Sequence, residues 1–258
     1  MQSLPHHNRS LAVLTGAGIS AESGVPTFRG PTGLWRNYHP EELATPHAFR
    51  RDPELVWAWY DWRRGLVGAC RPNAAHHTLA DMEQHSACLT LITQNVDGLH
   101  QLAGSSQLVE LHGNLWRLRC TRGCRPPWED RAVPLPAIPP RCPGCGALAR
   151  PDVVWFGEPL PAAALEAAWS AARRCQVMLV IGTSALVQPA ASLPLLAMEH
   201  GARVVEINPD PTPLSERVDE VIRQPAAAAL PAWWRKYRRT TDPGLSWAKP
   251  AVRPEEPA

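Results

Sequence analysis

The sequence has no apolar stretch that approaches the length of a membrane span, and residues 1–10 lack the apolar core of a signal peptide. It also lacks a strong charge of either sign, because 26 Lys and Arg oppose 24 Asp and Glu for a net charge of +2. That balance gives no support for a nucleic-acid-binding face. We therefore expect a cytoplasmic protein that makes no direct contact with nucleic acid or membranes.

Internal repeats are absent as well, and the sequence beyond Arg239 has no apolar periodicity. Residues 239–258 are therefore expected to form a disordered tail. The 258 residues are 45% hydrophobic, which is enough to bury a large core in one domain or in one domain with a smaller satellite.

Four short apolar runs that end at polar or glycine-rich residues predict buried strands: Leu11–Leu14, Leu89–Thr93, Val177–Gly182 and Ala202–Ile207. Segments rich in Ala and Leu, at residues 162–175 and 190–200, alternate with the later runs and are typical of helices. This alternation predicts an α/β fold with a Rossmann-like parallel sheet covered by helices. Ligands of such sheets bind at the carboxyl ends of the strands.

Two insertions interrupt this layout. Residues 31–71 are rich in tryptophan and predict a helical module, whereas residues 115–150 are rich in Pro, Arg and Cys and too poor in aliphatic residues to form a core without a staple. We expect the two insertions to form a smaller domain that is partly helical and partly zinc-binding. Residues 1–30, 72–114 and 151–238 then form the Rossmann-like domain.

The second insertion contains two close pairs of cysteines: Cys120, Cys124, Cys142 and Cys145. Two such pairs suit one tetrahedral Zn²⁺ held by four thiolates, and two disulfides are the alternative. With four sulfur ligands the metal has no open position, so we expect a structural role. The remaining cysteines are expected to be buried thiols: Cys70, Cys88 and Cys175.

Gly16, Ala17, Gly18 and Ser20 follow the first predicted strand, in the pattern of a turn that binds the pyrophosphate of a dinucleotide. A tight turn that binds nothing would have the same sequence. No acidic residue follows the next strand at the usual distance, which argues against a dehydrogenase. Hydroxyl, amide and small side chains do follow the later strands and favour a dinucleotide site: Thr93–His100, Leu111–Asn114, Gly182–Ser184 and Ile207–Pro209.

The ordered set of motifs resembles the sirtuins: Gly16–Ser20, Pro26–Arg29, Thr93–Asp97, His112–Asn114, the four cysteines, Phe156–Glu158 and Gly182–Ser184. The resemblance extends from about Leu11 to Pro231. It implies an NAD-dependent protein-lysine deacylase that transfers the acyl group to ADP-ribose, releases nicotinamide and consumes NAD as a co-substrate. Its partners would be acylated lysine side chains of proteins, and we expect a monomer.

The same resemblance implies roles for individual residues. His112 matches the general base. The NAD site would comprise Gly16, Ala17, Gly18, Ser20, Phe28, Arg29, Gln94, Asn95, Asp97, Gly182, Thr183, Ser184, Asn208, Pro209 and Ala226. A strand at 153–158 would pair with the peptide substrate through Val154, Phe156 and Gly157.

Tyr60 and Arg63 are three residues apart, so they share one face of a helix and can converge on a carboxylate. The alternative is a core tyrosine beside a solvated arginine. The surrounding sequence, including the small residue Ala44, resembles the sirtuin branch that removes succinyl, malonyl and glutaryl groups. Bacterial members of that branch often remove acetyl groups too. A plain deacetylase, a mono-ADP-ribosyltransferase and a non-enzymatic reader of acylated lysine remain alternatives.

Overall fold

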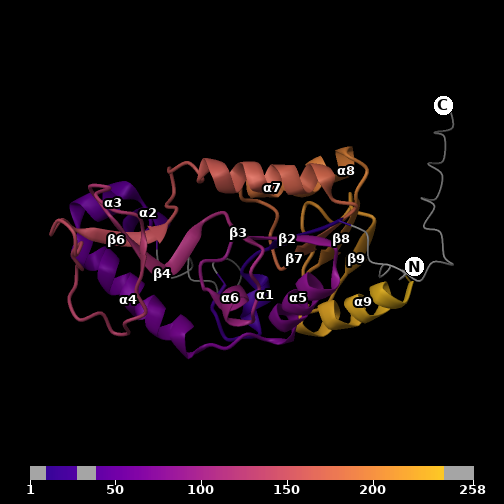
Figure 1. Ribbon diagram of the computed structural model, residues 1–258, viewed down its shortest axis with the longest axis horizontal. Helices are drawn as coiled ribbons and strands as arrows, with labels where there is room; N and C mark the ends of the chain where they lie inside the picture. The colour runs from indigo at the N-terminus through magenta and orange to yellow at the C-terminus, as the bar shows by residue number, and fades with distance from the viewer. Residues whose placement is uncertain (1–9, 28–38, 241–258) are drawn as a thin grey trace, which may run out of the picture.

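A parallel sheet of six strands forms the centre of the computed structural model, which describes residues 10–27 and 39–240 (Figure 1). The strand order is β3-β2-β1-β7-β8-β9. The strands are β1 (Ser10–Thr15), β2 (Cys88–Thr93), β3 (Leu108–Glu110), β7 (Val177–Ile181), β8 (Arg203–Ile207) and β9 (Glu220–Ile222). Because every pair in this sheet is parallel, the carboxyl ends of its strands lie at one edge.

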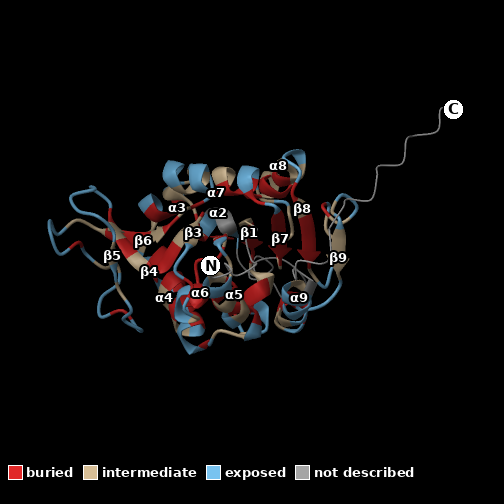
Figure 2. Ribbon diagram, turned by 45° about the vertical axis from the view of Figure 1, so that its right-hand side comes forward, coloured by how far each residue is buried: buried red, intermediate tan, exposed pale blue. Residues whose placement is uncertain are grey.

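Helices cover both faces of the sheet. Along β1, Leu11 and Val13 pack towards α5 (Ala74–His85) and α9 (Ala226–Thr240), whereas Ala12 and Leu14 pack towards α7 (Ala162–Arg174) and α8 (Leu193–Glu199). Figure 2 shows buried central strands between helices whose outer faces are exposed. Because both faces are covered, each central strand is a nearly continuous apolar run. The short helices α1 (Gly18–Ala21) and α6 (Leu99–Leu102) follow β1 and β2.

A second, antiparallel sheet with the order β5-β4-β6 lies beside α3 and α4, at the end of the molecule away from β8 and β9 (Figure 1). Its strands are β4 (Gly113–Cys120), β5 (Trp128–Glu129) and β6 (Ala149–Val153), and it packs with α2 (Pro40–Leu43), α3 (Pro46–Arg51) and α4 (Pro53–Ala69). A proline in the first turn and a capping side chain, Thr45 or Asp52, begin α3 and α4.

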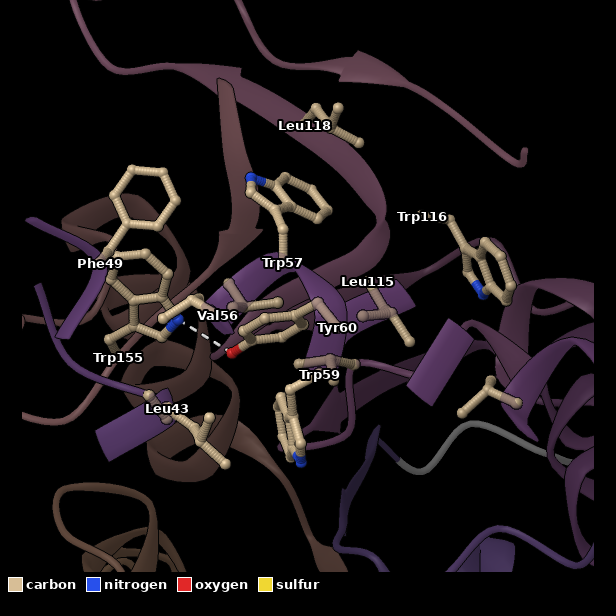
Figure 3. Packing of buried hydrophobic residues seen from close by; sticks show 14 of the residues in the cluster. Leu43, Phe49, Val56, Trp57, Trp59, Tyr60, Leu115, Trp116, Leu118 and Trp155 are labelled. Atoms are coloured by element: carbon tan, nitrogen blue, oxygen red, sulfur yellow. Dashed lines mark hydrogen bonds between the residues drawn. The ribbon is translucent and has the colours of Figure 1, made fainter. Parts of the chain in front are cut away.

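The two insertions share one core. Trp57 of α4 is completely buried, and its indole Nε1 donates a hydrogen bond to the carbonyl of Ala149 on β6 at 2.8 Å. Arg64, also fully buried, forms an ion pair with Asp130 at 2.6 Å. Figure 3 shows the aromatic rings of α4 packed between the strands and Trp155. The predicted fold class, a Rossmann-like sheet with a smaller domain of helices and a cysteine cluster, is therefore confirmed.

Some local predictions were wrong. Strand β6 ends at Val153, so residues 154–158 are not a strand. Cys88, expected to be buried, is exposed at the start of β2, whereas Cys70 and Cys175 are buried as predicted. Helix α9 continues to Thr240, slightly into the predicted tail, and residues 241–258 lie outside the described residues. No helix within residues 10–27 and 39–240 is both long and apolar enough to cross a membrane.

Candidate active site

A cavity of about 790 Å³ opens at the carboxyl ends of the sheet strands and extends to the small domain. Most of the predicted site residues line it: Gly16, Ala17, Gly18, Tyr60, Arg63, Gln94, Asn95, His112, Val154, Phe156, Gly157, Gly182, Thr183, Ser184, Asn208 and Pro209. The cavity thus joins the predicted dinucleotide, catalytic and acyl residues in one space. Phe28 and Arg29 lie outside the described residues.

The glycines of the first turn have a packing role that the sequence did not reveal. A Cβ on Gly16 would lie 2.8 Å from the carbonyl oxygen of Gly182, and a Cβ on Gly18 would lie 2.7 Å from the Cα of Gly182. Gly182 itself has φ of +59°, which favours glycine, and a Cβ there would lie 2.4 Å from the amide of Ile19. The turns after β1 and β7 therefore pack backbone against backbone, and both face the cavity.

His112 is oriented for proton transfer. Its Nδ1 lies 2.9 Å from the carbonyl oxygen of Gln94, which can only accept a hydrogen bond. We therefore assign the proton of the neutral ring to Nδ1, which leaves Nε2 as the acceptor. Burial lowers the pKa of His112 below its ordinary value, although the bond to Gln94 opposes the shift. The imidazole is thus neutral near pH 7, as a general base requires.

Two predicted NAD residues, Ser20 and Asp97, lie behind the cavity wall. The Ser20 hydroxyl donates to Asp97 Oδ2 at 2.8 Å and accepts a hydrogen bond from Asn95 Nδ2 at 3.1 Å. Asp97 Oδ1 accepts from the amide of Leu99 at 2.9 Å. Burial raises the pKa of Asp97. Among these three, only Asn95 lines the cavity, so Ser20 and Asp97 serve to hold its amide in place.

Behind Ser20 lie two histidines that the sequence analysis missed. His76 of α5 is 3.4 Å from the Ser20 hydroxyl, and His100 of α6 is 3.0 Å from the Thr15 hydroxyl. Their ring centroids are 4.9 Å apart. Burial lowers the pKa of His76 to about 4 and that of His100 to about 3, so both rings are neutral at pH 7. His100 ends the Thr93–His100 run that favoured a dinucleotide site, but no role was predicted for it, and His76 belongs to no motif; only the fold brings the two rings together.

On the far side of the cavity, Gln94 Nε2 donates to the hydroxyl of Thr183 at 3.0 Å, and Asn208 Nδ2 donates to the carbonyl of Thr183 at 2.8 Å. These bonds tie together the ends of β2, β7 and β8. The side chain of Ala226 lies in the core beneath α9, whereas the neighbouring Pro225 lines the cavity. The backbone near Ala226, predicted to lie on the adenosine side of NAD, is thus next to the cavity wall, and its contact with NAD stays a prediction.

Tyr60 and Arg63 lie on one face of α4 and line the cavity, where only 3% and 6% of their surfaces are exposed. The Tyr60 hydroxyl accepts a hydrogen bond from Trp155 Nε1 at 2.9 Å (Figure 3). The Arg63 guanidinium lies over the ring of Trp59, 5.4 Å from its centroid. Burial raises the pKa of Tyr60 and lowers that of Arg63. A solvated Arg63 is thus excluded.

In the segment predicted to pair with a peptide, the amides of Val154, Trp155 and Phe156 donate within the chain. The amide of Val154 donates to the carbonyl of His112, and that of Phe156 donates to the carbonyl of Ala44, both at 2.9 Å. The amide of Trp155 donates to Glu158 Oε2 at 2.9 Å. A peptide beside these residues would therefore donate to their carbonyl oxygens rather than accept from their amides. Trp155, which was not among the predicted substrate-binding residues, also lines the cavity.

The four predicted metal ligands form one cluster. Their sulfur atoms all lie within 4.8 Å of one another, with Cys120 3.5 Å from Cys124 and 3.6 Å from Cys145. A tetrahedral zinc with bonds of about 2.3 Å places its sulfurs roughly 3.8 Å apart, whereas a disulfide requires about 2.05 Å. The cluster therefore fits one zinc and excludes the disulfide alternative. None of the four cysteines lines the cavity.

Comparison with known proteins agrees with this arrangement. A model of the Sir2 family matches residues 16–189. The NAD-dependent protein deacylase 1 of Caldanaerobacter subterraneus subsp. tengcongensis is 56% identical over 216 residues, which cover 84% of this chain and 88% of that protein.

Among solved structures, a Sir2 homologue in complex with NAD has a TM-score of 0.85 and 48% identity, with 92% of each chain covered. A Sir2 variant with a deacetylated p53 peptide and 3'-O-acetyl ADP ribose has a TM-score of 0.81 and 33% identity, with 89% of this chain and 94% of the other covered.

Proposed function

The chain belongs to the Sir2 family. On this premise we propose that it is an NAD-dependent protein-lysine deacylase whose cavity favours acidic acyl groups such as succinyl and malonyl. The deacylase activity is supported by the names of relatives that cover most of the chain. The acidic preference is the further step, and it is supported by one observation. Tyr60 and Arg63 are buried in the wall of the same cavity that contains His112.

The residues around the cavity suit NAD. Small residues at the β1 turn keep the backbone close to the cavity, and hydroxyl and amide groups of Thr183, Ser184 and Asn208 line the part nearest β7 and β8. Asn95 and Gln94 line the part nearest His112. When bound, NAD supplies the ribose that accepts the acyl group, with nicotinamide as the leaving group. The protein contributes orientation of that ribose and exclusion of water by the cavity walls.

His112 is proposed as the general base. Its Nδ1 proton is held by the Gln94 carbonyl, so Nε2 is available to take a proton from a ribose hydroxyl. The lowered pKa keeps this nitrogen unprotonated near neutral pH. Asn95 is kept in place from behind by the Ser20 hydroxyl, which in turn donates to Asp97. We thereby assign proton transfer to His112 and positioning of the ribose to Asn95.

The acyl end of the cavity suits a carboxylate. The Tyr60 hydroxyl accepts from Trp155, so its own proton can be donated to a ligand, and its raised pKa keeps that proton in place. Arg63 supplies a positive charge where few water molecules screen it. A charge-assisted hydrogen bond contributes about 1.5–3 kcal/mol, which corresponds to roughly ten- to hundredfold discrimination against a neutral acyl chain. Ala44, also in the wall, leaves space beside them.

The proposal is tested by kcat/KM for succinyl-lysine and acetyl-lysine forms of one peptide, at saturating NAD. Wild type, Arg63→Met and the matched control Arg51→Met are compared, because Arg51 is exposed on the neighbouring helix α3. We expect wild type and Arg51→Met to prefer succinyl, and Arg63→Met to lose that preference but keep acetyl turnover. Preference for acetyl in wild type, with no effect of Arg63→Met, would show an ordinary deacetylase.

The same reaction mixtures separate the other activities. Nicotinamide release that depends on an acylated peptide excludes a reader that only binds acyl-lysine. NAD labelled in the ADP-ribose portion should yield labelled O-acyl-ADP-ribose, whereas label attached to protein would indicate mono-ADP-ribosyl transfer.

A cytoplasmic monomer that binds neither nucleic acid nor membranes is also part of the proposal. Sedimentation of the protein alone at micromolar concentration tests the monomer, and a larger species would contradict it. Protein that sediments together with added DNA or lipid vesicles would contradict the lack of binding, and the location in the cell is tested by fractionation.

A further inference from the structure

The hydroxyl of Tyr60 is connected through Trp155 to the ion pair Arg150–Glu158, in which Glu158 lines the cavity and Arg150 does not. Trp155 Nε1 donates to this hydroxyl, and the Trp155 ring carries the guanidinium of Arg150 at 3.3 Å from its centroid. Arg150 does not line the cavity; it lines a separate groove between α3 and the strands β4 and β6. Trp155 borders both spaces, so it is the wall between them.

Arg150 is itself fixed by two bonds to one carboxylate. Its Nη1 and Nη2 donate to Oε1 and Oε2 of Glu158 at 2.6 and 2.8 Å, and Nη2 also donates to the carbonyl of Val153 at 2.9 Å. The same carboxylate accepts the backbone amide of Trp155. Only 9% of the Arg150 side chain is exposed. Glu158 therefore holds Trp155 in two ways: it accepts a hydrogen bond from the Trp155 amide, and it binds the Arg150 guanidinium that stacks on the Trp155 ring.

We propose that the Arg150–Glu158 pair positions the Tyr60 hydroxyl through Trp155 and thereby sets the preference for acidic acyl groups. This inference rests on the proposed carboxylate pocket, and it adds that the Arg150–Glu158 pair keeps the Tyr60 hydroxyl of that pocket in position. A planar guanidinium can stack on an indole and grip a carboxylate with two bonds at once, and an ammonium cannot. The aligned indole N–H occupies one lone pair of the phenol oxygen, which directs the phenol proton towards the cavity. A neutral acyl chain makes no use of that proton.

The ion pair is suited to this role because it adds little net charge beside the pocket. Arg150 and Glu158 neutralise each other, so within residues 10–27 and 39–240 Arg63 remains the cation that a carboxylate meets in the cavity wall. Among the neighbours, Arg119 of β4 also contacts Glu158, at 3.4 Å, but its side chain is 40% exposed. Arg119 touches the same carboxylate without stacking on Trp155, which makes it a matched control.

The test uses Arg150→Lys, which keeps the charge and loses the stacked plane, and Trp155→Phe, which keeps a ring and loses the N–H donor. Arg119→Lys is the control. For each full-length variant, kcat and KM are measured separately for succinyl- and acetyl-lysine peptides, in the wild-type and in the Tyr60→Phe background. The thermal unfolding midpoint identifies any variant that fails to fold.

We expect Arg150→Lys and Trp155→Phe to lower kcat/KM for the succinyl peptide about fivefold, the value for one hydrogen bond of about 1 kcal/mol, mainly through KM. For Arg150→Lys, which does not line the cavity, acetyl turnover should change by less than about twofold, whereas Trp155→Phe is judged by a fall in the succinyl-to-acetyl ratio of kcat/KM. In the Tyr60→Phe background neither variant should lower succinyl turnover further, because the hydroxyl they position is absent. Arg119→Lys should leave the ratio unchanged.

Equal losses for both peptides, or a succinyl loss that persists in the Tyr60→Phe background, would show a merely structural role and overturn the inference. If Arg150→Lys does not fold, Trp155→Phe decides by the same criteria. Wild type that prefers succinyl and loses the preference in Tyr60→Phe, but keeps it in Arg150→Lys and Trp155→Phe, refutes this inference alone. Wild type without a succinyl preference removes the proposed pocket and this inference together.

Discussion

Trp57 connects the helical and cysteine-containing parts of the small domain, and its removal should weaken both. Trp57→Phe deletes the Nε1 donor to the Ala149 carbonyl, a buried hydrogen bond of 2.8 Å. Loss of such a bond costs about 1 kcal/mol. The smaller ring also leaves a void of up to about 40 Å³, which adds roughly 1 kcal/mol at about 24 cal/mol per Å³. We expect a total loss of about 2 kcal/mol, in keeping with a completely buried side chain.

Urea unfolding followed by circular dichroism measures this loss. Trp62→Phe on the same helix is the control, since Trp62 is 42% exposed and its change should cost less than about 0.5 kcal/mol. A second readout is the rate of zinc release to a chelator, because Ala149 pairs with the metal ligand Cys120 across β6 and β4. Equal stability of the two variants would refute the assignment of Trp57 as the link between the modules.

Three further predictions concern the histidines and the metal. His112→Ala should abolish deacylation and leave the thermal unfolding midpoint unchanged. In wild type, kcat/KM should rise with pH, and the apparent pKa of this rise should lie below the ordinary histidine value of about 6.5. An apparent pKa above that value would contradict the assignment of His112 as a neutral base. His76 and His100 have folded-state pKa values of about 4 and about 3, so the unfolded chain binds more protons as pH falls below about 6.5, and the free energy of unfolding should fall with it. His100→Gln should make this decline shallower, and an unchanged pH slope would count against it. Chelation during mild urea stress should release one zinc per chain from the cysteine cluster and destabilise the small domain, whereas a metal-free protein of full stability would rule out the four-thiolate site.

The sequence predicted the central strands well because burial on both faces makes each of them an apolar run. It did not predict β3 or β9, which have only three residues each and are partly exposed at the sheet edges. Helix α5 was missed because its alanines and histidines give a weak apolar pattern. The end of β6 at Val153 could not be predicted either. The turn that follows is set by Glu158, whose carboxylate binds the amide of Trp155.

For the site, sequence motifs located the residues that directly follow strands. They could not separate those that face the cavity, such as Asn95, from those that support it from behind, such as Ser20 and Asp97. Helical spacing placed Tyr60 and Arg63 on one face, but their burial depends on distant segments packing over α4. Arg150 is the last residue of the cysteine insertion, and Trp155 follows it, so both are far from Tyr60 in the sequence. Their relation to Tyr60 therefore exists only in three dimensions.

The close packing of the β1 and β7 turns has a mechanical consequence. Main-chain atoms of Gly16, Gly18 and Gly182 are in direct contact, with no side chain between them that could change rotamer. We therefore expect this part of the cavity to move less than the parts that are lined by side chains. The opposite wall is different, because Tyr60, Trp155 and Phe156 present side chains to the same space. We therefore expect motion of the cavity wall to be largest where Tyr60, Trp155 and Phe156 line it, and substrate exchange to be fastest in variants that loosen the packing of these side chains.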